Sequence, residues 1–284
     1  MDNISTLILA FALIVTMWGM GLGLVMQDFR RILDNPKAVY LGLLNQLVLL
    51  PLIGFLLVSF IPSSPEIAVG IMILAACPGG PTSNLLSMLA KADTALSVSL
   101  TAITSLVTIF TIPFIVNFGL ERFAGAGQNI QIDVLKTILT LLVIVIIPMS
   151  IGMLVRAKKT QFANKMAKPT RILSVILLAL IIVGIVIKEK DNVVEFFARA
   201  GILALMLNAI TMGFGYYSAK FMHLDRKQSL TISLESGVQN GTMALAIAGT
   251  LLANTAYGIA PAVYSLIMYF TSGIVITLFL RNKI

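Results

Sequence analysis

One acidic residue of this sequence, Glu235, lies deep inside a long apolar stretch. The other eleven of the twelve Asp and Glu residues fall in polar loops or near the ends of apolar stretches. A carboxylate within a membrane is costly unless it has a partner, so it is expected to be functional. No Lys or Arg lies at a comparable depth. The sequence therefore predicts that a cation, either a metal ion or a proton, neutralises Glu235. The alternative is a protonated Glu235 that only hydrogen-bonds between helices.

Neutral, oxygen-bearing side chains occur in similar apolar stretches. Ser97 and Thr101 are four residues apart, so they share one face of a helix. The other such residues are Ser83, Asn84, Gln46, Gln239 and Asn240. Hydroxyl, amide, backbone carbonyl and carboxylate oxygens suit Na⁺ better than a soft transition metal. The alternatives are hydroxyls that bond back to the preceding helical turn and glutamines that only tie helices together.

Other kinds of chemistry have little support in the sequence. A single cysteine, Cys77, excludes an internal disulfide and a cysteine-based zinc site, and a single histidine, His223, argues against a histidine-rich metal centre. No Walker motif, nucleophile elbow or HExxH motif is present. We therefore expect neither an enzyme nor an ATP-driven pump, and no cofactor other than coupling ions.

The composition requires a membrane protein. Of the 284 residues, 58% are hydrophobic and only 11% are charged, and the mean hydropathy is +0.99. Soluble domains carry about 25% charged residues. Apolar length predicts nine transmembrane helices, which are Ile4–Met26, Ala38–Phe60, Ile67–Ala90, Thr94–Phe118, Thr137–Val155, Ile172–Ile187, Ala200–Ala219, Ser229–Ala253 and Ile259–Leu280.

Basic residues predict how the chain is oriented. With the N-terminus outside, fifteen Lys and Arg residues face the cytoplasm and five face the exterior, in agreement with the positive-inside rule. The five are Arg122, Lys136, Lys188, Lys190 and Arg199; the fifteen are Arg30, Arg31, Lys37, Lys91, Arg156, Lys158, Lys159, Lys165, Lys168, Arg171, Lys220, Arg226, Lys227, Arg281 and Lys283. We therefore expect a multi-pass protein of the cell (inner) membrane with a cytoplasmic C-terminus. The net charge of +8 reflects this topology and does not indicate a nucleic-acid partner.

Two predicted helices are interrupted at matching places. The third has a break at 78–84 and the eighth near 237–241, and spans one to four can be laid on spans six to nine at an offset of roughly 160 residues. An odd number of spans separates the copies, so the repeat is inverted and its first copy lacks its first helix. Broken helices at matching positions of inverted repeats indicate a transporter's binding site at the membrane midplane, whereas Pro and Gly that only kink a helix are the alternative. The second half-helices are expected to start near Asn84 and Asn240, where their N-termini favour anions.

These segments resemble the sodium/bile acid symporter family. The matching stretches are 76–80 with Ser83-Asn84, 95–101, 235–240, and 45–46 through Pro51. The resemblance implies one unit over 1–284, with a core domain at about 37–118 and 192–284 and a panel domain at about 1–36 and 131–190. It implies two crossed, discontinuous helices in the core, and nine spans as in some animal members.

The resemblance also implies the site residues. The first sodium site would use Ser83, Asn84, Ser97, Thr101 and Glu235. The second would use Gln46, Glu235, Gln239 and the backbone carbonyls of Ser236 and Val238. The substrate would lie near Thr82, Asn84, Asn240 and Pro81, where the family often has Thr in place of Pro81.

The expected function is sodium-coupled symport of an organic anion by alternating access. The anion is either bile-acid-like or a small organic acid such as pantoate, which bacterial relatives carry. The alternatives are a proton-coupled organic anion carrier and a channel or non-transporting ligand sensor. The expected partners are the anion, sodium ions and the lipid bilayer.

Overall fold

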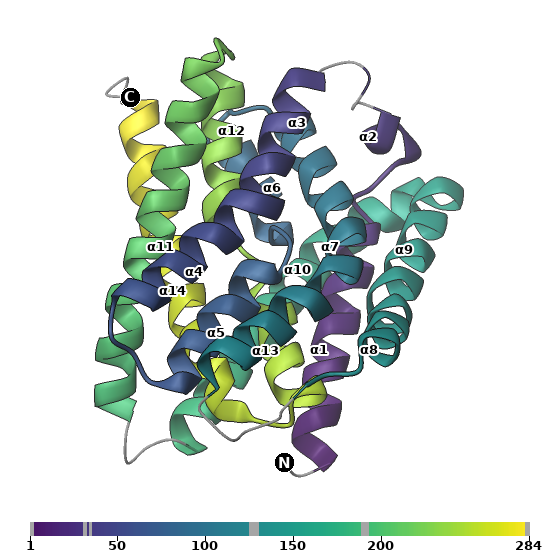
Figure 1. The fold of residues 1–284 in the computed structure, drawn as a ribbon. Coiled ribbons are helices and arrows are strands. Elements are labelled where there is room, and N and C mark those ends of the chain that lie inside the picture. The colour runs from purple at the N-terminus through teal and green to yellow at the C-terminus, as the bar shows by residue number, and fades with distance from the viewer. Residues whose placement is uncertain (1–2, 31–32, 34–35, 125–130, 189–192, 282–284) are drawn as a thin grey trace.

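The fold is helical throughout the part of the chain that the structure describes. A computed structural model describes residues 3–30, 33, 36–124, 131–188 and 193–281 (Figure 1). In the first half of the chain the helices are α1 Asn3–Gly21, α2 Met26–Arg30, α3 Pro36–Leu44, η1 Asn45–Leu49, α4 Leu50–Phe60, α5 Pro65–Ala76, α6 Pro81–Leu89 and α7 Thr94–Phe123. In the second half they are α8 Val134–Leu141, η2 Leu142–Ile146, α9 Ile147–Lys158, α10 Thr160–Lys188, α11 Val193–Phe221, α12 Arg226–Gly237, α13 Gly241–Ala246, η3 Ile247–Leu251, η4 Thr255–Gly258 and α14 Ile259–Leu280.

Six helices in the described residues are long and apolar enough to cross a membrane. They are Pro36–Phe60, Thr94–Phe123, Val134–Lys158, Thr160–Ile187, Phe197–Phe221 and Thr255–Leu280. This confirms an integral membrane protein with several spans. The other three predicted spans correspond to α1, to α5 with α6, and to α12 with α13 and η3, which are shorter pieces.

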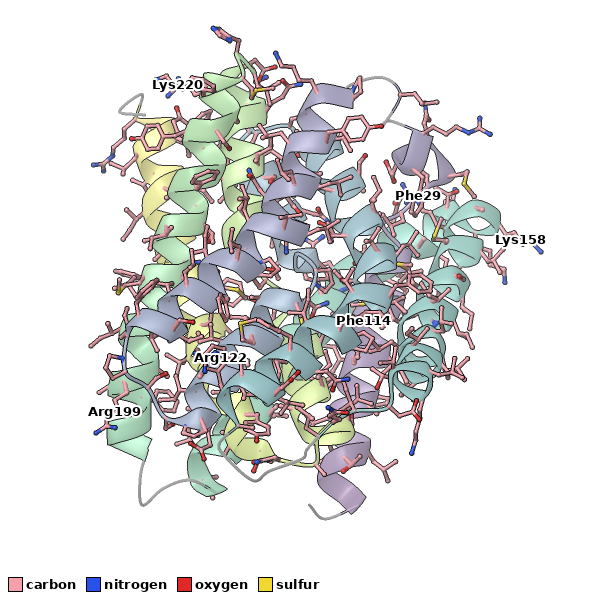
Figure 2. The ribbon with its side chains drawn as sticks, viewed as in Figure 1. Phe29, Phe114, Arg122, Lys158, Arg199 and Lys220 are labelled. Carbon is pink, nitrogen blue, oxygen red and sulfur yellow. The ribbon has the colours of Figure 1, made fainter. Side chains whose placement is uncertain are left out.

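The long helices carry apolar stripes that face away from the protein. Exposed large side chains recur every four residues from Tyr40 to Phe60 and from Leu135 to Ile151, and again at Phe110, Phe114 and Phe118. A four-residue spacing keeps side chains on one face of a helix. Figure 2 shows Phe114 on α7 among these outward side chains. Such stripes are expected where helices contact lipid.

The broken segments lie at the centre of the fold. Every residue of α5 from Ile67 to Ala76 is buried, as is every residue from Ser229 to Gly237 in α12. Helices α11, α14, α7 and α3 pack around them, and α1 packs against α9, α10 and the second broken segment at α13 (Figure 1). The polar half of α12 is therefore shielded by protein instead of facing lipid.

Two boundaries differ from the sequence-based expectation. Helix α10 begins at Thr160, so the basic residues Lys165, Lys168 and Arg171 are helical and do not form a loop before a span at Ile172. Helix α7 continues to Phe123, beyond the predicted end at Phe118. Pro113 and Pro169 both lie inside helices. Proline disrupts helix interiors in soluble proteins because it has no N–H group, whereas transmembrane helices tolerate it.

Both ends of the molecule carry basic residues. Figure 2 shows Lys220 at one end, Arg199 toward the other and Lys158 on the side of the molecule. The first turn of α1 and the last turn of α14 likewise lie at opposite ends (Figure 1). Arg31, Lys190 and Lys283 of the charge count lie outside the described residues, as does the side chain of Lys188.

Candidate functional site

The two helix breaks meet through their backbones. Helix α5 ends at Ala76 and α6 begins at Pro81, while α12 ends at Gly237 and α13 begins at Gly241. Gly79 and Gln239 pair in antiparallel fashion, the N–H of Gly80 donates to the carbonyl of Val238 at 2.9 Å, and the N–H of Asn240 donates to the carbonyl of Pro78 at 3.0 Å. These bonds satisfy backbone groups that the interrupted helices leave free. They also hold four half-helix ends together.

Two glycines permit this close approach. A Cβ atom at Gly80 would lie 2.8 Å from the backbone oxygen of Gln239, and one at Gly79 would lie 2.9 Å from Oε2 of Glu235. Real Cβ atoms essentially never come so close to another atom. Pro81 then occupies the first turn of α6, a position where its fixed φ angle and missing N–H are tolerated. Helix α6 therefore begins at Pro81, and Asn84 is its fourth residue instead of its start.

Glu235 lies in a cluster of polar oxygens beside the breaks. One carboxylate oxygen, Oε1, accepts a short hydrogen bond from the hydroxyl of Ser97, and Oε2 accepts one from Thr101 at 2.9 Å. The amide oxygen of Asn84 lies 2.9 Å from the Ser97 hydroxyl and 3.2 Å from that of Thr101. The Ser83 hydroxyl lies 3.3 Å from that of Thr101. We call Ser83, Asn84, Ser97, Thr101 and Glu235 the carboxylate cluster.

The carboxylate cluster has more acceptor oxygens than hydroxyl hydrogens. Its hydroxyl hydrogens come from Ser83, Ser97 and Thr101, one from each. Ser83 is 2.8 Å from the carbonyl of Gly80, which leaves two hydroxyls to serve two carboxylate oxygens, the Asn84 amide oxygen and nearby backbone carbonyls. No described lysine or arginine forms an ion pair with Glu235, which is only 4% exposed. A carboxylate that is buried without a basic partner is stabilised when a positive charge, from a metal ion or a proton, neutralises it.

Gln46 and Gln239 form a second polar group at the breaks. Nε2 of Gln46 donates to Oε1 of Gln239 at 2.6 Å, and Nε2 of Gln239 lies 3.3 Å from Oε1 of Gln46. Gln46 also reaches the carbonyl of Cys77 at 3.3 Å, and Gln239 reaches that of Ser236 at 2.9 Å. We call Gln46 and Gln239 the glutamine pair. Each amide is satisfied by the other and by a backbone carbonyl.

A π-helical turn positions the glutamine pair. Pro51 has no N–H to donate to the preceding turn, and the chain widens into η1 directly before it. Consecutive side chains in η1 are both buried: Gln46 contacts Gln239, and Asn45 donates to the hydroxyl of Ser218 in α11 at 3.2 Å. The predicted second set is therefore brought together in part. None of its hydrogen bonds in the described residues joins Glu235 to the glutamine pair.

Two residues that the sequence did not point to support the second break. The side chains of Asn208 in α11 and Tyr264 in α14 both donate to the carbonyl of Gly237 at 2.8 Å. This carbonyl ends α12 and has no partner within its own helix. Neither residue stands out in the sequence, because each is one of several polar residues in a mostly apolar helix and lies 27 or more residues from Gly237 along the chain.

A cavity of about 210 Å³ lies against the paired breaks. Gly80, Pro81, Thr82, Gln239 and Asn240 line one wall. Asn84 also lines the cavity, so all four predicted substrate residues border it. The opposite wall comes from α1 and α10, and its lining residues include Thr16, Gly19, Thr170, Arg171 and Ser174. Half-helix N-termini at the first wall favour an anion.

The described residues hold no group of three or more His, Cys, Asp or Glu side chains able to bind a metal ion. A transition-metal centre therefore has no support in this part of the chain. The carboxylate cluster instead offers oxygen ligands, which are the ligands that a hard cation prefers.

Comparison with known proteins identifies the family. The sequence profile of the Sodium Bile acid symporter family matches residues 10–196. The chain is 28% identical over 82% of its length to an uncharacterized sodium-dependent transporter, YocS, of Bacillus subtilis (strain 168), of which it covers 71%. It is 30% identical to the ileal sodium/bile acid cotransporter of Cricetulus griseus over 84% of its length, covering 67% of that protein. It is 27% identical to the probable chloroplastic sodium/metabolite cotransporter BASS2 of Oryza sativa subsp. japonica over 94% of its length, and spans 62% of that relative.

Proposed function

The chain belongs to the sodium bile acid symporter family, and we propose that it couples the inward movement of sodium to that of an organic anion. The family consists of sodium-dependent transporters and not of enzymes, and the described helices make this a multi-pass membrane protein. We place the chain in the cell (inner) membrane with its N-terminus outside, because 15 basic residues then face the cytoplasm and 5 the exterior.

The observation that carries this proposal is the shortage of hydrogens in the carboxylate cluster. A sodium ion among the oxygens of Ser83, Asn84, Ser97, Thr101 and Glu235 would neutralise the buried carboxylate and use the lone pairs that lack a donor. This is the first proposed sodium site.

A second sodium site is proposed at the glutamine pair. Its ligands are Gln46, Gln239, Glu235 and the carbonyls of Ser236 and Val238. In the structure the Ser236 carbonyl accepts from Gln239, and that of Val238 accepts from Gly80. An ion here requires the two amides to part, so that their oxygens turn toward it. Two sodium ions moving down a 100 mV potential would supply about 4.6 kcal/mol of drive.

The cavity is proposed to hold the anion. Its lining residues Thr82, Asn84, Asn240 and Pro81 lie at the starts of the second half-helices. Pockets for drug-sized ligands are about 300–1,000 Å³, so a volume of about 210 Å³ favours a small organic acid, such as pantoate, over a bile acid. Sodium bound at the breaks would fix the half-helix ends, and this couples ion binding to anion binding.

Alternating access is proposed to occur between two domains. Residues 37–118 and 192–284 would form a core and residues 1–36 and 131–190 a panel, built from nine spans as an inverted repeat that lacks its first helix. The cavity supports this division, because its two walls come from the two proposed domains. Movement of one wall past the other would open the cavity to either side.

Uptake into proteoliposomes tests the proposal. Replacing external Na⁺ by choline should abolish accumulation of a small organic acid, with a protonophore present and no membrane potential. A proton-coupled carrier is the second candidate, since a carboxylate among hydroxyls can also bind a proton. Uptake that survives in choline but collapses with the protonophore would establish that candidate instead. Sodium binding without any uptake would indicate a ligand sensor.

A further inference from the structure

The charge in the cavity is concentrated on one residue. Arg171, on α10, is the one charged side chain among the described residues that line the cavity. It is partly buried, and no described residue forms an ion pair or hydrogen bond with its guanidinium group. A guanidinium group presents five donors in a fork that matches a carboxylate. Arg171 therefore offers an unused anion partner on the α10 wall.

The opposite wall offers a second, independent anion partner. The amide nitrogen of Asn240 is buried and has no hydrogen-bond partner, although its amide oxygen accepts from the N–H of Met243 at 3.0 Å. The N-terminus of α6 begins at the same wall, and its N-cap residue, Gly80, provides no side-chain cap. Leaving such donors unpaired is costly unless a ligand uses them.

The two partners lie at different depths. Leu178 of α10 lies against Gly241, next to Asn240, and Arg171 precedes Leu178 by seven residues. At a rise of about 1.5 Å per residue, these α10 positions are about 10 Å apart along the helix. A ligand with one acidic group cannot use both partners fully, whereas a small molecule with acidic groups at both ends can.

We propose that the cavity selects small dicarboxylates, with one carboxylate on Arg171 and the other at Asn240 and the N-terminus of α6. This deepens the proposed function and rests on it, because the same cavity is assigned to the transported anion. The volume agrees, because about 210 Å³ lies below the range of about 300–1,000 Å³ for drug-sized ligands and so suits a small molecule. Arg171 is then a specificity-determining residue.

Thermal stability of the purified, full-length protein in detergent tests the proposal. The probes are glutarate and adipate, each compared with the monocarboxylate of equal chain length, in NaCl and in choline chloride. For the unmodified protein we expect the dicarboxylates to stabilise at concentrations about tenfold lower than the monocarboxylates. In Arg171→Gln, dicarboxylates and monocarboxylates should bind with the same weak affinity. Arg171→Lys should restore part of the preference for dicarboxylates.

Lys168→Gln is the matched control. Lys168 lies one turn earlier on α10, is exposed and does not line the cavity, so its removal should leave the preference unchanged. A dicarboxylate preference that persists in Arg171→Gln, or the absence of binding by any dicarboxylate to the unmodified protein, would overturn the proposal. So would an effect of Arg171→Gln seen only when phosphatidylglycerol is added, since Arg171 would then bind a lipid headgroup.

The comparison of NaCl with choline chloride distinguishes a failure of this proposal from a failure of the proposed function. If NaCl stabilises the protein over choline chloride but dicarboxylates are not preferred, only the assignment of Arg171 fails. If NaCl has no effect, the sodium-coupled function itself fails.

Discussion

The carboxylate cluster and the glutamine pair both lie beside the same paired breaks, yet their hydrogen bonding differs. The carboxylate cluster has too few hydroxyl hydrogens for its acceptor oxygens. The glutamine pair satisfies itself, because each amide both donates and accepts. The first group is therefore ready to receive a cation, and the second must rearrange before it can do so.

This difference suggests an order of events. At the proposed first site, an ion would enter the carboxylate cluster without displacing a hydrogen bond between the two breaks. An ion at the glutamine pair must separate Gln46 from Gln239, and Gln239 belongs to the break whose backbone pairs with Gly79. Binding of an ion at the glutamine pair would therefore directly shift the half-helix ends that line the cavity.

Among single substitutions in the two polar groups, Glu235→Gln should have the largest effect. It replaces a charged ligand by a neutral one of the same shape. We expect sodium-stimulated uptake to fall by on the order of 100-fold or more, because removing one partner of a buried charge pair costs about 3–5 kcal/mol. Initial uptake rates in proteoliposomes would measure this. Uptake within threefold of the unmodified protein, with sodium dependence retained, would contradict the assignment of the carboxylate cluster.

The double substitution of Gln46→Ala with Gln239→Ala should separate the two groups. Sodium-stimulated uptake should be abolished, because one coupling ion is lost. Sodium should still stabilise the purified protein, with a Hill coefficient that falls from about two to about one. A Hill coefficient that remains near two would show that the glutamine pair does not bind sodium.

Thr101→Val should have a smaller effect within the carboxylate cluster. The substitution keeps the shape of the side chain and removes a hydroxyl that contacts both Glu235 and Asn84. The concentration of sodium for half-maximal stabilisation should rise about tenfold, as expected for a lost hydrogen-bonding ligand of a charged group. Thr104→Val is the control, since the Thr104 hydroxyl bonds back to the carbonyl of Leu100 at 2.9 Å and does not reach Glu235. Equal shifts in both variants would argue against a specific role for Thr101.

Gly80→Ala should affect stability by forcing the breaks apart. Its Cβ would lie 2.8 Å from the backbone oxygen of Gln239, and overpacking costs about 1–3 kcal/mol. The apparent Tm should fall by roughly 2–12 °C. Gly184→Ala in α10, where a Cβ meets nothing within 4 Å, should leave the Tm unchanged or slightly raised. An unchanged Tm in Gly80→Ala would mean that the close backbone pairing is not required.

The breaks could be located from the sequence because their signal is local. Pro and Gly next to polar residues interrupt an apolar run. The structure ends α5 at Ala76, two residues before the first predicted break, and ends α12 at Gly237, where the second predicted break starts. The start of α10 could not be found in this way. Lys165, Lys168 and Pro169 have the composition of a loop, and only packing against α1 and α9 shows that they continue a helix.

The family resemblance predicted which residues form the carboxylate cluster and the glutamine pair. Residue spacing alone could not predict them. Ser97 and Thr101 share a helix face, but Glu235 lies more than 130 residues away along the chain. Similarly, no local pattern indicates that Gln46 contacts Gln239, or that Asn208 and Tyr264 converge on the carbonyl of Gly237. Such contacts arise from the tertiary arrangement of helices.

Direct binding of ²²Na⁺ to the purified protein tests the central claim, that the carboxylate cluster holds sodium. The unmodified protein should bind ²²Na⁺ saturably, and excess unlabelled Na⁺, but not K⁺, should displace it. Glu235→Gln should lose this binding while it elutes as a folded, monodisperse species in detergent. Saturable binding of the same affinity in Glu235→Gln would contradict the account.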